Sequence, residues 1–399
     1  MSSTLSSTAV RAVWLLTLAA CTVCPAVVTA ADASPAGTGS DDVRQAIGTI
    51  LKVDRFGRGN REAADAARRL SAASVDALPH VLQAMNDAND LARNWLRGVA
   101  EAIADKAFRE KRPLPKQWLE KFVTDRANHP RARRLAYELL LRVDPSARER
   151  LIPGMIDDPA PEFRRDAVAR LIKQADAALQ ADQTDEAREL LEKALQAATD
   201  RDQVEALVKR LEPLGRTVDL QRHFGFITQW YMIGPFDNRG GVGFAAEYPP
   251  ERQVDLNATL NGQLGPVKWT PVRTDDPYGL IDITKLFRNY KGSVMYAYTE
   301  FYSPREQTVE FRLATPNAWK LWLNGKLLFG REEYHRGTRM DQYRVPATLR
   351  KGKNTILLKI CQNEQTQDWA QRYQFQFRVV EPSGRAVLSQ SPADLSLRR

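Results

Sequence analysis

Cysteine is scarce in this sequence of 399 residues, which contains three: Cys21, Cys24 and Cys361. The first two lie in an apolar segment near the N-terminus, so a chain that loses this segment keeps one cysteine and no internal disulfide. Stability must then come from the hydrophobic core, which a content of 43% hydrophobic residues can supply. Because Cys361 follows the apolar run "NTILLKI", we predict a small buried side chain rather than a reactive thiol.

The sequence also lacks the common catalytic motifs. It contains no Gly-x-Ser-x-Gly, no His-Glu-x-x-His and no Gly-x-x-x-x-Gly-Lys. Of its four histidines, only His335 has acidic neighbours in the sequence, namely Glu332, Glu333 and Asp341. We interpret this stretch as a solvated charged loop, with a metal or acid-base role as the alternative. The sequence therefore predicts a protein that is not an enzyme and holds no cofactor or metal.

Long hydrophobic runs are missing after residue 30, where no segment reaches the ~20 apolar residues that a membrane helix requires. Residues 1–30 have the pattern of a signal peptide: Arg11 precedes a short apolar stretch, Pro25 interrupts it, and small residues lead to Ala30. We predict cleavage after Ala30 and export to the periplasm or the extracellular space. The alternative is a lipid anchor at Cys21, because "LAAC" resembles a bacterial lipoprotein box.

Charge and aromatic residues are distributed unevenly along the rest of the chain. Residues 31–220 hold 32 basic, 32 acidic and 7 aromatic residues, whereas residues 221–399 hold 25, 17 and 25. This difference predicts two domains of different construction. We expect a disordered linker over 31–44, helical repeats over 45–215, a linker over 216–226, a β-sandwich over 227–382 and a flexible tail over 383–399.

The first domain has the periodicity of paired helices. In "EARELLEKALQAATDRDQVEALVKRLEPLG" the apolar residues recur three and four apart, which forms one stripe along a helix. In "DDPAPEFRRDAVARL" an acid-proline turn precedes arginine and an Ala-x-x-x-Leu helix, and this pattern resembles a HEAT repeat. The resemblance covers about residues 45–175, while residues 175–215 look more like a tetratricopeptide hairpin. It implies a HEAT-like α-solenoid, a fold whose extended surface contacts other proteins.

The second domain consists of short segments rich in aromatic and β-branched residues, among them "QWYMIGPFDN", "GSVMYAYTEFYS" and "YQFQFRVV". Many strands without helical periodicity between them predict a β-sandwich or jelly roll. Asn324-Gly325 in "NAWKLWLNGKLLFG" predicts a two-residue hairpin turn. The expected pairs are Leu323 with Lys326, Trp322 with Leu327, Leu321 with Leu328, and Lys320 with Phe329.

The two faces of this predicted hairpin differ in composition. The face that we expect in the core carries only apolar side chains: Trp319, Leu321, Leu323 and Leu328. The opposite face also carries a lysine, and consists of Lys320, Trp322, Leu327 and Phe329. On this face Trp322 and Phe329 either form a ligand platform or lie under a loop or the helical domain. We favour the covered arrangement, because large exposed apolar patches are uncommon on monomers.

Four segments of the second domain resemble a known fold or proteins that carry it. "AWKLWLNGKLLFG" followed by "YRVPATLRKGKNTILLKI" is similar to the sugar-binding β-sandwich of family 2 glycoside hydrolases and to the wider galactose-binding-like fold, and "LIDITKLF" resembles another segment of it. "WYMIGPFDNRGGVGF" resembles exported proteins of planctomycete-type bacteria that carry this sandwich. The resemblance covers about residues 225–381 and implies a galactose-binding-like jelly roll. It also implies a carbohydrate ligand as one use of the fold, which serves elsewhere as a structural wall.

The stretch "CQNEQTQDWAQRYQF" predicts where a ligand binds. Amides and carboxylates beside an indole are the groups that bind sugar hydroxyls and sugar ring faces. The candidate site is formed by Trp322, Tyr334, His335, Gln362, Asn363, Glu364, Asp368 and Trp369. The alternative is a structural loop in which Trp369 closes the end of the sandwich.

These features predict an exported, non-catalytic binding protein whose sandwich recognises carbohydrate and whose helical repeats contact another protein. The alternatives are an assembly scaffold without sugar binding and, less favoured, a glycoside hydrolase. The basic surplus of the second half also permits contact with acidic polymers. Export argues against nucleic acid as a partner, and the sequence carries no stacking motif of RNA-binding modules.

Overall fold

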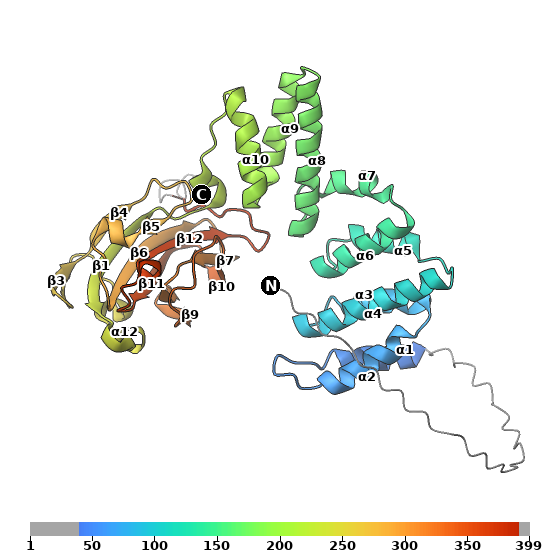
Figure 1. The fold of residues 1–399 in the computed structure, drawn as a ribbon, viewed down its shortest axis with the longest axis horizontal. Helices are drawn as coiled ribbons and strands as arrows, with labels where there is room; N and C mark the ends of the chain where they lie inside the picture. Colours follow the sequence, from blue (N-terminus) through green and yellow to red (C-terminus); the bar gives the residue numbers. More distant parts are fainter. Residues whose placement is uncertain (1–39, 391–399) are drawn as a thin grey trace, which may run out of the picture.

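The computed structural model describes residues 40–390, in which a helical part precedes a part made of antiparallel sheets (Figure 1). The predicted signal segment, the alternative anchor at Cys21 and most of the predicted linker 31–44 lie outside these residues. The end of that linker is helical, because α1 already begins at Ser40. Val43 is buried in the helical core, and Asp41 and Asp42 in the first turn favour a helix start there.

Successive helices of the first part pack against each other and form a curved row (Figure 1). Their bounds are α1 Ser40–Ile50, α2 Asn60–Ser71, α3 Leu78–Ala84, α4 Asp90–Arg109, α5 Lys116–Thr124, α6 Pro130–Val143, α7 Ala147–Leu151, α8 Pro161–Gln180, α9 Thr184–Ala197 and α10 Arg201–Leu211. Short 3-10 turns at Val75–Ala77, Ile152–Met155 and Glu212–Leu214 lie between or after them. Within residues 40–390 no helix is both long enough and apolar enough to cross a bilayer.

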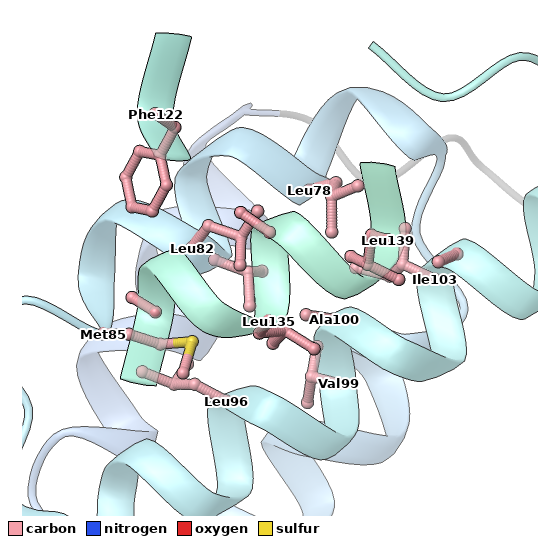
Figure 2. Close-up of a cluster of buried hydrophobic side chains, with 14 of the residues drawn as sticks. Leu78, Leu82, Met85, Leu96, Val99, Ala100, Ile103, Phe122, Leu135 and Leu139 are labelled. Carbon is pink, nitrogen blue, oxygen red and sulfur yellow. The ribbon is translucent and has the colours of Figure 1, made fainter. Parts of the chain in front are cut away.

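The helical part is held together by apolar side chains shared between neighbouring pairs of helices (Figure 2). On α4 the buried residues recur three and four apart, so one stripe of this helix faces its neighbours. Figure 2 shows this stripe meeting side chains of α3, α5 and α6; the labelled residues are Leu78, Leu82, Met85, Leu96, Val99, Ala100, Ile103, Phe122, Leu135 and Leu139. Each pair of helices therefore depends on the next for its burial.

The acid-proline turn before α8 is fixed by a buried ion pair. The Asp158 carboxylate accepts two hydrogen bonds from the Arg133 guanidinium, at 2.8 and 2.7 Å, and both side chains are 1% exposed. Asp158 also accepts from the backbone N–H of Ala160 at 2.9 Å, which sets the turn that starts the helix. This bidentate geometry pairs the Arg133 and Asp158 charges with each other at a position buried from water.

The second part contains two larger antiparallel sheets that enclose one hydrophobic core. The six-stranded sheet has the order β4-β1-β6-β11-β8-β9, with bounds Thr270–Arg273, Gln229–Asp237, Ser293–Ser303, Gly352–Gln362, Ala318–Leu323 and Lys326–Arg331. The four-stranded sheet has the order β10-β7-β12-β5, with bounds Tyr343–Leu349, Gln307–Ala314, Gln374–Val380 and Ile281–Asp282. A small ribbon pairs β2 Thr259–Gly262 with β3 Gly265–Lys268. Short helices lie at α11 Leu220–Phe224, α12 Val242–Ala245, α13 Pro249–Arg252 and α14 Ile283–Leu286.

The Asn324-Gly325 hairpin forms the β8–β9 turn, which confirms the first two predicted pairs. Both turn residues have positive φ, at 53° and 78°, as a two-residue turn of this kind requires. Farther from the turn the register shifts: Leu321 pairs with Phe329, and Lys320 with Gly330. The predicted pairs with Leu328 and Phe329 are therefore wrong, because a bulge inserts one extra residue into β9.

The core face of the hairpin is the predicted one, since Trp319, Leu321 and Leu323 are at most 6% exposed in the core between the sheets. Of the residues predicted on the opposite face, Trp322 is covered and 6% exposed, whereas Leu327 and Phe329 are 47% and 45% exposed, so the covered arrangement is confirmed for Trp322 and wrong for Phe329. Trp322 packs in a second apolar cluster under residues 244–267, together with Tyr248 and Val254. Trp322 is therefore part of a covered surface, and the prediction that it contacts a ligand directly is wrong for this structure.

The predicted linker 216–226 is folded at the boundary between the two parts. It contains α11, and Phe224 and Phe226 are buried in a cluster with residues of α9 and α10. The predicted flexible tail also begins with attached residues: Val387 is 9% exposed and donates its N–H to Val379 at 2.9 Å. Burial and backbone hydrogen bonds therefore fix residues of both segments, although their composition predicted a linker and a flexible tail.

Candidate functional site

The loop after β11 and the loop between β9 and β10 meet at one end of the sheets. Nε2 of His335 lies 2.8 Å from the amide oxygen of Asn363, so this nitrogen carries the hydrogen and donates it. The His335 ring also lies 5.1 Å from the Trp369 ring, at an angle of 87°. The backbone N–H of His335 donates to Pro316 at 2.5 Å, which fixes the residue in its left-handed conformation, φ 59°. Three predicted site residues are thus brought together.

Trp369 presents its indole to solvent from an anchored turn. The side chain is 60% exposed and lies in the 3-10 turn Asp368–Ala370. The amide of Gln371 closes this loop by donating to the carbonyls of Thr366 and Gln367. Exposing the apolar face of an indole to water is unfavourable. Because the turn holds Trp369 in this exposed position, its ring can stack against the apolar face of a ligand.

Gln362 positions the loop and is not available to a ligand. Its side chain is fully buried, and the amide N–H groups donate to the carbonyls of Ala370 and Arg372, both at 3.2 Å. The amide oxygen accepts from Asn317 at 3.1 Å. Because both ends of the amide are already paired, the prediction that Gln362 contacts a ligand is wrong for this structure.

Tyr334 forms the inner edge of the cluster and depends on a residue that the sequence analysis missed. Its hydroxyl accepts from Asn238 at 3.2 Å, and burial raises the pKa of Tyr334 to about 12. Asn238 is fully buried and donates also to the carbonyl of Gln362 at 2.9 Å. Its own amide oxygen has no hydrogen-bond partner among residues 40–390. Asn238 thus connects the loop that carries Tyr334 with the end of β11. The only sequence feature that could have indicated it is its position at the end of the strand segment "QWYMIGPFDN".

Two carboxylates lie at the exposed rim of the cluster. Glu364 accepts from the backbone N–H of Gly240 at 2.8 Å, and Asp368 begins the turn that carries Trp369. Neither carboxylate forms an ion pair with a residue in the described part of the chain. They remain acceptors for hydroxyl groups beside the indole.

Two of the three acids near His335 in sequence pair with arginines, and the third, Glu332, is exposed. Glu333 lies between the guanidinium groups of Arg331 and Arg336, at 2.8 and 3.3 Å, which lower the pKa of its carboxyl. Asp341 is turned toward Arg378 and Arg312 near α11. Within residues 40–390 no three His, Cys, Asp or Glu side chains are grouped as metal ligands. The arrangement can bind hydroxyl groups and a ring face, and the group that pairs with the His335 ring is the Asn363 amide.

A second polar cluster lies under the cover of the six-stranded sheet. Lys359 is fully buried, and its ammonium donates to Glu251 at 2.7 Å and to the carbonyls of Ala246 and Phe244 at 2.6 and 3.2 Å. Glu251 also accepts from the hydroxyl of Tyr296. Nearby Cys361 is 0% exposed, which confirms the predicted buried thiol, and burial raises its pKa to about 12. The Lys359 bonds attach residues 244–251 to the six-stranded sheet, and Lys359 and Cys361 are buried from solvent.

No known protein-family model matches the sequence, and no curated protein matches it. Among solved structures, a family 35 carbohydrate-binding module from Clostridium thermocellum is similar at 18% identity and a TM-score of 0.16, over 23% of this chain and 73% of that one. A β-glucuronidase from Ruminococcus gnavus is similar at 13% identity and a TM-score of 0.23, over 39% of this chain and 28% of that one.

A β-glucosidase from Kluyveromyces marxianus in complex with glucose is similar at 10% identity and a TM-score of 0.25, over 75% of this chain and 36% of that one. The chain thus spans about a third of the length of these two glycosidases. These TM-scores are too low for any of the three similarities to support a function. A functional proposal must therefore rest on the side chains of the candidate site.

Proposed function

We propose that the protein is an exported, non-catalytic binding protein that recognises carbohydrate at the surface formed by His335, Asn363 and Trp369. The β part would be a galactose-binding-like jelly roll carried on a HEAT-like α-solenoid. The observation that carries the proposal is the exposed Trp369 indole standing perpendicular to an imidazole that Asn363 orients. The indole stacks on the apolar face of a sugar ring, while amide and carboxylate groups pair with its hydroxyls.

The rim residues complete this surface. Glu364 and Asp368 supply acceptors for hydroxyl groups, and the protonated Tyr334 phenol supports the loop from inside. The buried Gln362 and Asn238 hold the two loops together, so the surface exists before a ligand arrives. A preformed surface loses little conformational entropy on binding, which favours recognition of a small polar ligand.

A glycan array followed by calorimetry tests the proposal. Wild type should bind at least one glycan, and Trp369→Ala or His335→Ala should weaken that binding at least ten-fold at an unchanged melting temperature. Phe56→Ala is the matched control, because this aromatic side chain is 72% exposed in the helical part and should leave binding unchanged. Glycan binding that survives both site variants would refute the proposed surface.

The second candidate is an assembly scaffold that binds no sugar. The observation in its favour is an apolar groove of about 830 Å³ between α2 and α4, lined by Ala67, Leu91 and Trp95 among others. Crosslinking in the native envelope would then retain a protein partner and no glycan. A glycoside hydrolase has the least support, and it would be revealed by turnover of aryl glycosides.

A further inference from the structure

A cavity of about 240 Å³ is lined by residues of α6, α7 and α8. These helices lie in the helical part, away from the strands that carry the proposed sugar surface (Figure 1). Tyr137 of α6 lines the cavity together with Arg148 and Glu149 of α7, and Asp166, Arg170 and Lys173 of α8. A single water needs only about 10–15 Å³ of such space. The cavity therefore has room for a group of several atoms.

The acids of this cavity already have partners, whereas two of its cations do not. Asp166 pairs with Arg134 at 2.6 Å, and Glu149 pairs with Arg170 at 3.3 Å. Neither Arg148 nor Lys173 forms an ion pair with any residue between 40 and 390. The cavity thus contains two cations that have no ion-pair partner in the described part of the chain.

A buried hydroxyl without an acceptor lies among these charges. Tyr137 is 1% exposed, and its hydroxyl finds no acceptor among the described residues, whereas the Arg148 side chain lies close enough to donate to its oxygen. The ring cannot turn away, because Phe163 packs against it at 5.5 Å and the Arg134 guanidinium covers it at 5.4 Å. Burial raises the pKa of the Tyr137 phenol, with Arg148 close enough to oppose this, so at neutral pH the hydroxyl carries a hydrogen to donate. Buried donors of this kind normally have an acceptor.

An acceptor that satisfies the phenol and both cations must be an anion, and the charge of the lining limits which one. Three bases and two acids line the cavity, an excess of one positive charge. A carboxylate matches this excess and offers two oxygens, one for the phenol and one for a guanidinium or ammonium. A dianionic phosphate would add repulsion from Glu149 and Asp166.

We propose that the cavity between α6, α7 and α8 binds a carboxylate group, either an acidic side chain of a partner protein or a small organic acid. The carboxylate accepts from the Tyr137 hydroxyl and pairs with Arg148 and Lys173. This site is independent of the proposed sugar surface, so either can fail without the other.

The test uses the full chain labelled with 3-fluorotyrosine and followed by ¹⁹F NMR. The Tyr137→Phe variant assigns the resonance of residue 137. Titration with sodium acetate, at an ionic strength held constant with potassium chloride, should shift this resonance to a plateau. The Arg148→Gln/Lys173→Gln variant should abolish the plateau. The matched control is Arg61→Gln/Lys121→Gln, which removes the same charge from exposed positions of the helical part and should behave as wild type.

A second titration separates the two sources of the carboxylate. A short glutamate-rich peptide that saturates the shift at a concentration at least ten-fold below acetate identifies a protein segment, and equal concentrations identify a small acid. A shift that never reaches a plateau, or one that is unchanged in the Arg148→Gln/Lys173→Gln variant, overturns the proposal. Inorganic phosphate that saturates the shift at a lower concentration than acetate overturns the assignment to a carboxylate.

Discussion

Lys359 and Glu251 form an ion pair at 2.7 Å although they are 108 residues apart and are 0% and 9% exposed. Lys359 belongs to β11, in the six-stranded sheet, and Glu251 belongs to α13, in the segment that covers this sheet. The ammonium also reaches two backbone carbonyls of the cover. This pair therefore joins the sheet to its cover and keeps Trp322 out of water.

Removing one partner of this pair should destabilise the β part strongly. Lys359→Met leaves the buried Glu251 carboxylate without its countercharge and two carbonyls without their donor, and such losses cost about 3–5 kcal/mol. Urea unfolding at pH 7 should show this loss in the free energy of unfolding. The double variant Lys359→Met/Glu251→Leu should recover part of it, because no uncompensated charge remains.

The control for this prediction is the same substitution at an exposed ion pair. Lys353 pairs with Glu300 and is 50% exposed, so Lys353→Met should change the free energy of unfolding by at most ~1 kcal/mol. Equal losses for the two lysine variants would contradict the special role of the buried pair.

The Asp341 carboxylate should make stability depend on pH. Burial alone would raise its pKa, but the Arg378 and Arg312 guanidinium groups overcome this and lower the pKa below its usual value. A carboxyl group with a lowered folded-state pKa stabilises the fold above its unfolded pKa of about 3.9, and this contribution disappears as the pH falls through the folded-state pKa.

Asp341→Asn should therefore be less stable than wild type at pH 7, and the difference should shrink between pH 4 and pH 2. Urea midpoints measured across this range check the prediction. Asp275→Asn is the control, since its side chain is 91% exposed and should leave the pH profile unchanged. A difference that stays constant down to pH 2 would mean that Asp341 contributes without its charge.

Local features could be predicted from the sequence where neighbouring residues determine them. Asn324-Gly325 allows positive φ at both turn positions, so the turn and the pairs next to it were predictable. The bulge at Leu328, three residues after the turn, was not predictable, because no turn residue marks it; beyond it Phe329 lies beside Trp319, at 5.6 Å between ring centres. Linker and tail were misjudged for the same reason, since contacts with distant segments bury Phe224 and Val387.

The sequence predicted which residues lie near the candidate site, but not which of them are exposed and which are buried supports. His335, Asn363 and Trp369 meet as expected, while Gln362 and Trp322 are buried, and burial is not visible in the residue type. Asn238 was missed because its partners lie 96 and 124 residues away. Composition thus indicated which residue types belong to the proposed surface, and only long-range contacts show which of them are exposed and which are buried.

The helical core should respond to substitutions according to burial. Leu96 of α4 is fully buried in the shared core, so Leu96→Ala should cost about 2–5 kcal/mol of unfolding free energy (Figure 2). Leu91, on the same helix, is 40% exposed, and Leu91→Ala should cost much less. Thermal unfolding followed by circular dichroism at 222 nm compares the two. Similar melting temperatures would show that α4 does not join its neighbours as described.

The loop that carries Trp369 should lose its order when Gln362 is replaced. Gln362→Leu keeps the size of the side chain but removes its hydrogen bonds to the carbonyls of Ala370 and Arg372, and it leaves the backbone N–H of Asn363 without its acceptor, at a cost of about 1–3 kcal/mol. Because these bonds hold both ends of the turn, amide hydrogen exchange in residues 363–373 should accelerate more than exchange in β6. Gln367→Leu is the control: this residue is exposed in the same loop, and the substitution should leave exchange in the turn near the wild-type rate. If exchange accelerated equally in the turn and in β6, Gln362 would support the whole sheet rather than the loop, and the turn would owe its order to other contacts.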